Sequence, residues 1–236
     1  MNDTVKFIVI VNPNNPTGNV AKPSTIMEVL SIAKDWPNCT IIADEIYDAL
    51  DFSGDQRSVA SLSDEVPVVT LNGVSKVHFA PGWRIGYMAF FDPKRTLQAP
   101  RDGAERILRS RLCASTPAQY GYLAGLNHDR LWLKERLRTI ERRVDLCMNR
   151  IEGIEGLSCN KPGGAFYLFP KIDNPSKYGS DKKFVLDLLH EEHVLVVHGS
   201  GFSPRYGSGH FRLVALAPED LLNEAFDRID RFVRSR

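Results

Sequence analysis

The stretch Lys6-Phe7-Ile8-Val9-Ile10-Val11 runs directly into Asn12-Pro13, and this abrupt change from apolar to polar residues decides the first element of the fold. The last four residues of the apolar run are β-branched, which favours an extended strand. Apolar residues follow one another without alternation, as in a strand buried on both faces. Proline cannot donate a hydrogen bond to a sheet, so Pro13 ends the strand. The sequence therefore predicts a buried strand followed by a polar turn.

Comparable runs recur through the first half of the chain. They occupy residues 40–43, 66–71 and 85–91. A helix is predicted from Pro23 onward, with Thr25 and Glu28 spaced as a capping box. Buried strands joined partly by helices predict an α/β fold, with a mainly parallel sheet that carries helices on both faces. Such sheets bind ligands beyond the carboxyl ends of their strands.

The second half has a different pattern. Apolar residues recur every three or four positions from about residue 129 to 152, which predicts one long amphipathic helix that ends before Gly153 and bridges two domains. Further strands are expected at 165–169, 194–197 and 211–216, and further helices from Ser180 to about Glu192 and from about Pro218. We therefore predict two domains: residues 1–128 from a large domain, and a small α+β domain at residues 129–236.

Composition limits the kinds of partner. In 236 residues, 30 Lys and Arg balance 29 Asp and Glu, for a formal net charge of +1. No basic field for nucleic acid is present, and no apolar run approaches the roughly 20 residues that a membrane span needs. The four cysteines form no C-x-x-C pair and no histidine stands at metal-ligand spacing. We expect a small-molecule ligand, no metal, no nucleic acid, no membrane, and a reducing, cytoplasmic location.

Polar residues follow two of the predicted strands and are candidates for a site. The turn 12–18 contains two prolines and a glycine, which would hold the amide of Asn15 toward a ligand or leave it to cap its own backbone. Asp44 ends the strand 40–43, where a carboxylate needs a cationic partner. Tyr47 would present its hydroxyl to the same place. The alternatives are a helix N-cap for Asp44 and a core aromatic for Tyr47.

A third polar segment, residues 72–86, contains two cations. Lys76 stands between Val74 and Phe79, a setting that would lower the pKa of its amine and make it a nucleophile. Arg84 stands at the start of the next strand, where a guanidinium suits a phosphate. The alternatives are an exposed loop lysine and an arginine paired with an acid.

The order of these groups, with 32 residues from Asp44 to Lys76, resembles the class I/II aminotransferases. These are pyridoxal 5′-phosphate (PLP) enzymes of fold type I, the aspartate-aminotransferase superfamily. The resemblance covers essentially the whole chain and is greatest to the alanine aminotransferases of prokaryotes, including archaea. The stretches that carry it are 72–76, 111–113, 116–119, 163–167 and 197–202.

The resemblance implies a role for each candidate. Lys76 would be the Schiff-base lysine and the general base and acid, and Asp44 would pair with the pyridine nitrogen. Asn15 and Tyr47 would hydrogen-bond the phenolic oxygen of the cofactor. Arg84 would hold the phosphate.

Arg212 matches the family arginine that binds the substrate α-carboxylate, with Asn15 beside it. From periodicity alone, Arg212 could equally be an outward residue on a strand. The chain departs from the family at Gly73, where members usually have a hydroxyl residue that contacts the phosphate. The glycine pairs 163–164 and 199–201 would line the substrate side or simply form turns.

Complete members of the family have a long segment before the first strand of this chain. That segment supplies the ring that stacks on PLP and much of the phosphate site, so we expect this chain to be N-terminally truncated and to expose apolar sheet surface. The implied reaction is L-alanine plus 2-oxoglutarate to pyruvate plus L-glutamate, in a protein that is a homodimer when complete. The alternatives are an aminotransferase for another amino acid, a PLP-dependent C–S lyase, and an inactive fragment or interaction module.

Overall fold

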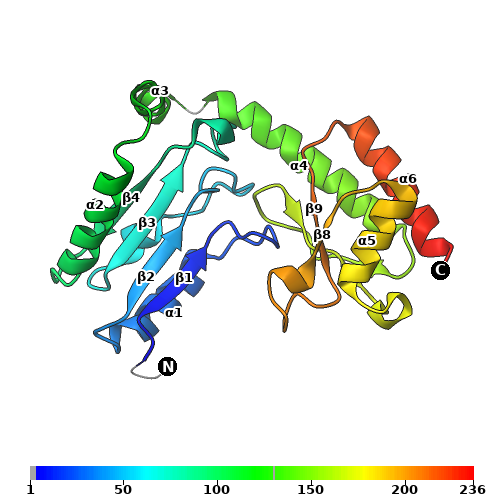
Figure 1. Ribbon diagram of the computed structural model, residues 1–236, viewed down its shortest axis with the longest axis horizontal. Coiled ribbons are helices and arrows are strands. Elements are labelled where there is room, and N and C mark those ends of the chain that lie inside the picture. The colour runs from blue at the N-terminus through cyan, green and yellow to red at the C-terminus, as the bar shows by residue number, and fades with distance from the viewer. Residues whose placement is uncertain (1–3, 130) are drawn as a thin grey trace. The chain divides into compact units, whose positions relative to one another are not determined.

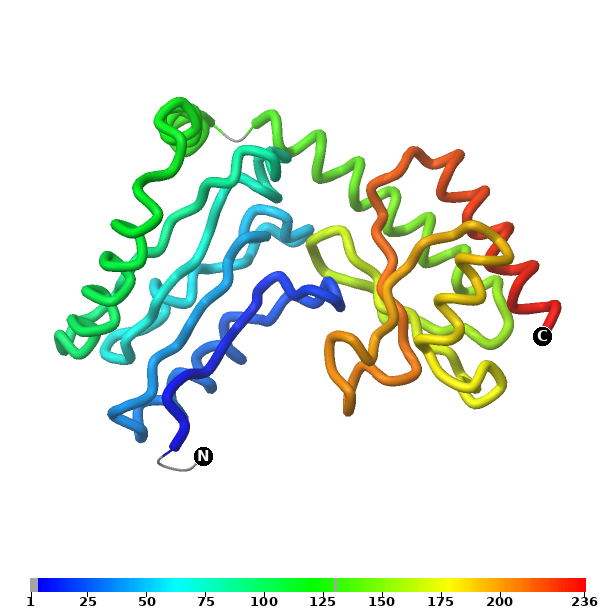
Figure 2. Tube along the Cα trace, viewed as in Figure 1, coloured from blue at the N-terminus to red at the C-terminus, as the bar shows by residue number. Residues whose placement is uncertain are grey.

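The computed structural model describes residues 4–129 and 131–236, and contacts divide the chain into two compact units. Unit 1 comprises the chain up to Pro13 together with Val20–Leu133. Unit 2 comprises Asn14–Asn19 and Lys134–Arg236. The short turn 14–19 therefore belongs by its contacts to unit 2, although its neighbours in sequence belong to unit 1. Figure 2 traces the chain through both units.

Unit 1 is built on a four-stranded sheet in the order β1-β2-β3-β4, seen in Figure 1. The strands are β1 (Phe7–Val11), β2 (Thr40–Asp44), β3 (Val68–Gly73) and β4 (Gly86–Phe91). The helices of the unit are α1 (Pro23–Lys34), α2 (Gln98–Arg111) and α3 (Thr116–Asn127), with 3-10 turns η1 (Val59–Leu62) and η2 (Pro81–Trp83). Strands β1, β2 and β3 are parallel, and β4 runs antiparallel to β3. The predicted α/β fold with a mainly parallel sheet is confirmed.

Helix α1 packs one face of the sheet. Its buried residues Ile26, Leu30 and Ala33 form a cluster with Ile41 and Ala43 of β2. Burial of such aliphatic side chains is worth about 1.5–3 kcal/mol each.

The predicted capping box at the start of α1 is wrong. Lys22 is the N-cap residue and Pro23 the first helical residue, and no side chain caps the helix. Proline at this position is preset for the helix and has no N–H to satisfy. Thr25 is therefore already inside the first turn.

Strand β1 is only half buried, whereas the sequence predicts a buried strand. Ile8 and Ile10 pack against the α1 cluster, but Phe7 is 56% and Val9 63% exposed. These two residues share the opposite face of the strand, because side chains alternate across a sheet. The expected exposure of apolar sheet surface is therefore present at β1.

Unit 2 combines helices with short strands. Its strands are β5 (Leu157–Ser158) and β7 (Lys171–Ile172), which pair with each other, and β6 (Tyr167–Leu168), β9 (Phe211–Val214) and β8 (Val197–His198), which form a second sheet in that order. Its other elements are α5 (Asp181–Glu192), α6 (Glu219–Arg234), η3 (Pro175–Tyr178) and η4 (Gly199–Gly201). Helix α4 (Leu131–Glu152) begins in unit 1 and continues into unit 2.

Aromatic rings form the centre of unit 2. Phe184 of α5 is fully buried and lies against Tyr178, Phe211 and Phe232, with ring centroids 4.8–5.3 Å apart. Helix α6 completes this core through five buried residues, Leu222, Phe226, Ile229, Phe232 and Val233. Among the described helices of the chain, none is long and apolar enough to span a membrane.

Candidate functional site

The carboxyl ends of the parallel strands of unit 1 lie at one edge of the sheet. Val11 pairs with Asp44 at the ends of β1 and β2, and Asp44 pairs with Leu71 of β3, which continues to Gly73. Asp44 is half-buried, and its Oδ1 accepts a hydrogen bond of 3.2 Å from the Ile46 N–H. The residues that follow form a turn and not a helix, so Asp44 is not a helix N-cap. The same turn carries Tyr47, which is buried.

Glu45, next to Asp44, is a buried carboxyl that the sequence analysis missed. Its Oε1 accepts a 2.7 Å hydrogen bond from the Val59 N–H of η1. Burial raises the pKa of Glu45, against the opposing effect of the hydrogen bonds from Val59 and Ser58. The position of Glu45, one residue after an apolar strand ends, is the sequence signal that could have predicted a buried carboxyl there. Glu45 ties the turn that carries Asp44 and Tyr47 to η1.

Lys76 follows β3 by three residues and is half-buried. Its Nζ lies 5.9 Å from the centroid of the Tyr47 ring, so the structure brings these two predicted residues together. The backbone carbonyl of Lys76 accepts a 3.1 Å hydrogen bond from the Phe79 N–H, which closes a turn. Lys76 is therefore held in a tight turn beside Tyr47, not on an open loop.

Arg84 is not brought to Lys76 by any described contact. It has a left-handed backbone (φ 51°) and an exposed side chain, and its Nη1 donates a 2.6 Å hydrogen bond to the Pro81 carbonyl. The alternative of an arginine paired with an acid does not describe this contact. Arg84 is accessible to an anion but already bonded to its own turn.

Gly73 has a structural reason for the departure from the family pattern. A Cβ at Gly73 would lie 2.8 Å from the Ile85 carbonyl oxygen, and one at Gly86 would lie 2.5 Å from the Asn72 oxygen. The two glycines face each other across β3 and β4. The close approach of these backbones excludes a hydroxyl side chain at position 73.

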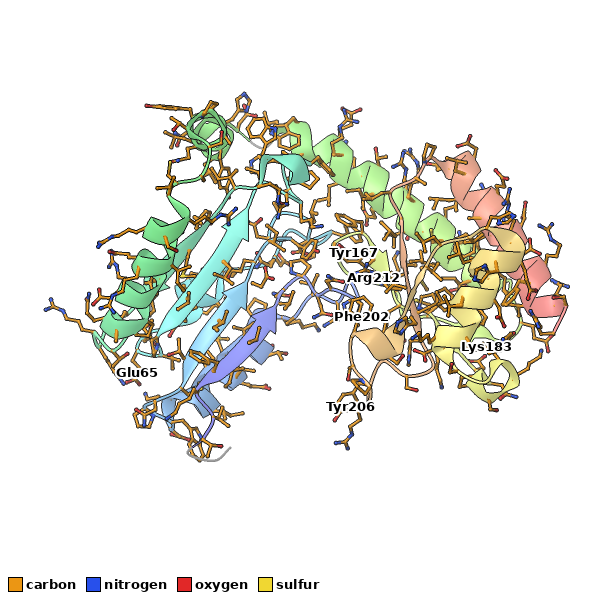
Figure 3. The ribbon with its side chains drawn as sticks, in the orientation of Figure 1. Glu65, Tyr167, Lys183, Phe202, Tyr206 and Arg212 are labelled. Atoms are coloured by element: carbon orange, nitrogen blue, oxygen red, sulfur yellow. The ribbon has the colours of Figure 1, made fainter. Side chains whose placement is uncertain are left out.

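In unit 2, Asn15 and Arg212 are directly bonded. Nη1 of Arg212 donates a 2.7 Å hydrogen bond to Oδ1 of Asn15, which is 197 residues away in sequence. Figure 3 shows Arg212 with two aromatic residues, Tyr167 and Phe202, beside it. Arg212 is therefore not simply an outward-facing strand residue, because its guanidinium is partly buried and hydrogen-bonded.

The turn that carries Asn15 is fixed to unit 2 by backbone contacts. The Gly18 carbonyl accepts hydrogen bonds of 3.0 and 2.9 Å from the N–H groups of Gly163 and Gly164. Gly18 has φ +67°, and a Cβ there would lie 2.5 Å from Cβ of Pro162. The glycines predicted either to line the substrate side or to form turns thus have a defined task, which is to hold the Asn15 turn.

One donor of Arg212 is unsatisfied. Its Nε is buried and has no hydrogen-bond partner among the described residues. A buried unsatisfied donor costs about 1–3 kcal/mol. An incoming anion that accepts from Nε would recover this cost and would add a charge-assisted bond. The arrangement is suited to binding a carboxylate.

The residue types of unit 1 fit pyridoxal phosphate. The set comprises an amine (Lys76), a carboxylate at a strand end (Asp44), a phenol whose ring centroid lies 5.9 Å from the amine (Tyr47) and an accessible guanidinium (Arg84). These groups match an aldehyde, a pyridine nitrogen, a phenolic oxygen and a phosphate. Gly73 has no side chain to offer a phosphate, and Arg84 is the predicted phosphate residue of segment 72–86.

Other chemistry finds less support. Burial raises the pKa of the Cys147 thiol to about 12, so this thiol stays protonated near neutral pH. All four cysteines are free, with Cys113 exposed. Within residues 4–129 and 131–236, no group of three or more His, Cys, Asp or Glu side chains is arranged to hold a metal ion.

Comparisons with known proteins find relatives that match nearly the whole of this chain. The chain is 39% identical over 238 residues to glutamate-pyruvate aminotransferase AlaA of Haemophilus influenzae, covering 99% of this chain and 58% of that protein. It is 37% identical to an aspartate aminotransferase of Bacillus subtilis, covering 98% of this chain and 58% of the relative. Among solved structures, an alanine aminotransferase from Pyrococcus furiosus superposes with a TM-score of 0.95 and 47% identity, over 100% of this chain and 59% of that one.

The chain thus spans less than two thirds of the length of each of these relatives. The family model for aminotransferase class I and II matches residues 1–229. On these matches, the chain belongs to the class I and II aminotransferases.

Proposed function

We propose that this polypeptide is a PLP-dependent aminotransferase that converts L-alanine and 2-oxoglutarate to pyruvate and L-glutamate. The observation that carries the proposal is the Arg212 guanidinium, bonded to Asn15 and left with a buried, unsatisfied Nε–H. This is a donor set for the carboxylate that every amino acid and every 2-oxo acid shares. The names of the relatives from Haemophilus influenzae and Pyrococcus furiosus support the choice of alanine.

Each residue of unit 1 has a defined task in this proposal. Pyridoxal phosphate, when bound, supplies a ring that accepts the electron pair left at the substrate α-carbon. Lys76 takes the proton from that carbon and returns it, as general base and acid. The Asp44 carboxylate keeps the ring nitrogen protonated, and Arg84 offers its guanidinium to the phosphate.

Two neutral groups and one cation orient the reactants. When the cofactor is bound, the Tyr47 hydroxyl and the Asn15 amide would each offer a hydrogen bond to its phenolic oxygen. Arg212 binds the substrate carboxylate, while its bond to Asn15 fixes the guanidinium in the plane that a two-point contact requires.

The cofactor part is tested with the 236-residue chain and added PLP. We expect a visible absorbance band that depends on pH and is absent in Lys76→Ala. Lys182, which is exposed, provides the matched control, and Lys182→Ala should keep the band. Borohydride reduction followed by peptide mapping should place the label at Lys76. A band that survives in Lys76→Ala would contradict the assignment of the lysine.

The substrate part is tested by adding amino acids to the PLP-treated chain. Bleaching of the band by L-alanine, with release of pyruvate, is the expected result. Faster bleaching by L-aspartate would favour the second candidate, which the 37% identity to the Bacillus subtilis aspartate aminotransferase supports. Release of a thiol from a cysteine conjugate would indicate a C–S lyase. A chain that binds PLP but reacts with none of these would be an inactive fragment or an interaction module.

We further propose a cytoplasmic location and a homodimer as the functional form. Four free thiols support a reducing compartment. Exposed apolar side chains on α2 and α3 and just after α2, including Ile107, Leu108, Leu112 and Tyr120, support a protein partner. Sedimentation equilibrium of the chain tests the homodimer. A strictly monomeric species at high concentration would contradict it for this polypeptide.

A further inference from the structure

Two aromatic rings lie against the Arg212 guanidinium. Its Cζ is 4.7 Å from the centroid of the Tyr167 ring and 4.8 Å from that of Phe202. Tyr167 is buried, and Phe202 is 38% exposed. Figure 3 shows the three side chains together in unit 2. A guanidinium attracted by ring faces loses the freedom to turn about its own bonds.

The strand register explains why Tyr167 reaches Arg212. Tyr167 on β6 pairs with Val214 on β9, and Arg212 shares the face of Val214, two residues away. Tyr167 and Arg212 are therefore diagonal neighbours on adjacent strands, within reach for an aromatic ring and a long side chain.

A separate set of contacts fixes Phe202. It follows η4, and its N–H donates a 2.9 Å hydrogen bond to the carbonyl of Gly199, the first residue of η4. The Ser200 N–H in η4 donates a 2.6 Å hydrogen bond to the buried carboxylate of Asp181. A Cβ at Gly199 would lie 2.2 Å from the Gly207 oxygen, so no larger residue fits there. The loop therefore holds Phe202 at one place.

We propose that Phe202, together with Tyr167, is a positioning residue for Arg212. The rings hold the guanidinium in the orientation that satisfies Nη1 with Asn15 and leaves Nε–H for a carboxylate. The rings offer no acceptor in place of that carboxylate, and they exclude water from the guanidinium face, which strengthens a charge-assisted bond. The inference deepens the proposed function and rests on its assignment of Arg212 as the carboxylate-binding residue.

The test compares Phe202→Leu with Phe202→Tyr, which restores the ring, and with Tyr206→Leu as a control. Tyr206 is on the same loop, is exposed, and lies against Arg205 rather than Arg212. The first readout is the NMR signal of the Arg212 Nε–H in the chain without ligand, assigned by its loss in Arg212→Lys. We expect several-fold faster solvent exchange of this proton in Phe202→Leu, and wild-type exchange in Phe202→Tyr and Tyr206→Leu.

The second readout is the affinity for pyruvate, taken as a simple monocarboxylate. Phe202→Leu should weaken binding about 3- to 10-fold, whereas Phe202→Tyr and Tyr206→Leu should bind as the wild type does. Unchanged Nε–H exchange in Phe202→Leu would overturn the positioning role. Changes in the backbone amide chemical shifts throughout unit 2 of Phe202→Leu would also overturn it, since they would show that Phe202 has a merely structural role. If the wild type fails to bind pyruvate while the exchange results hold, the proposed carboxylate role of Arg212 fails and the positioning by Phe202 stands.

Discussion

Arg212 in unit 2 and Lys76 in unit 1 are held by different means. Arg212 is fixed by side chains from distant parts of the sequence: the amide of Asn15 and the rings of Tyr167 and Phe202. Lys76 is fixed by backbone, because its turn follows a strand that approaches its neighbour as closely as two glycines allow. The comparison separates a site made by packing from a site made by chain geometry.

The two units also differ in how their apolar residues are covered. Unit 2 encloses the Phe184 ring, which contacts the rings of Tyr178, Phe211 and Phe232. Unit 1 leaves apolar side chains of β1, β4 and α2 exposed, including Phe7, Met88 and Leu108. We therefore expect the Arg212 arrangement to depend on the core beneath it, and the Lys76 turn to depend on glycine.

The largest effect should come from Phe184→Ala. Truncation of a fully buried phenylalanine costs about 3–5 kcal/mol. Phe184 lies 5.3 Å from the ring of Phe211, the neighbour of Arg212 in β9, so the loss reaches the Arg212 strand. Urea unfolding measures the free energy. Phe7→Ala, which removes an exposed ring, should change it by no more than about 0.5 kcal/mol. Equal losses in the two variants would contradict the difference between the units.

An intermediate effect is expected from Gly73→Ala. The added Cβ would meet backbone atoms of Ile85 and Gly86, which cannot move without opening β3 from β4. Overpacking of this kind costs about 1–3 kcal/mol. Gly82→Ala is the control, because a Cβ there meets nothing within 4 Å. The yield of PLP adduct at Lys76 should fall in the first variant and not in the second. A Gly73→Ala protein with wild-type stability and labelling would show that the backbone approach does not hold the turn.

The sequence predicted the elements of unit 1 better than the packing of unit 2. The runs that ended at Asn12, Asp44 and Asn72 identified three parallel strands and the edge of the sheet where they end, because a buried strand is a local pattern. Their bounds shifted by one or two residues, as for β3, which the sequence predicted to begin at Val66 and which begins at Val68. Helices α2 and α3 were not predicted, although Thr116-Pro117 at the start of α3 is a common helix opening.

The surroundings of Arg212 were beyond local patterns. Tyr167, Phe202 and Asn15 are 45, 10 and 197 residues from it, and only the register of β6 and β9 and the fold of the 199–207 loop bring them together. Resemblance identified Arg212 and Asn15, but it offered no reason for their contact. The periodicity of a sequence predicts which residues share a face of a sheet. The position of the Arg212 guanidinium depends instead on contacts between a strand and distant loops, which periodicity does not predict.

The smallest expected effect is a pH dependence carried by two glutamates of unit 1 with opposite signs. Burial raises the pKa of Glu45 above its ordinary value of 4.5. The folded state then binds this proton more tightly than the unfolded state, so stability falls as the pH rises from about 4.5 through the folded pKa. Hydrogen bonds from Lys34 and Lys94 lower the pKa of Glu65 to about 2. Its contribution is present above the unfolded value of 4.5 and is lost as the pH falls toward 2.

Glu45→Gln and Glu65→Gln separate these contributions, since glutamine keeps the shape and removes the titration. We expect urea midpoints measured from about pH 3 to pH 7 to show a weaker decline with rising pH in Glu45→Gln than in the wild type, and a weaker loss on acidification in Glu65→Gln. Glu65 is on the surface, so its effect should shrink in high salt, whereas that of the buried Glu45 should persist. Matching salt dependence in both variants would mean that Glu45 is not enclosed beside η1, and that the turn of Asp44 and Tyr47 is as open to solvent as the surface of unit 1.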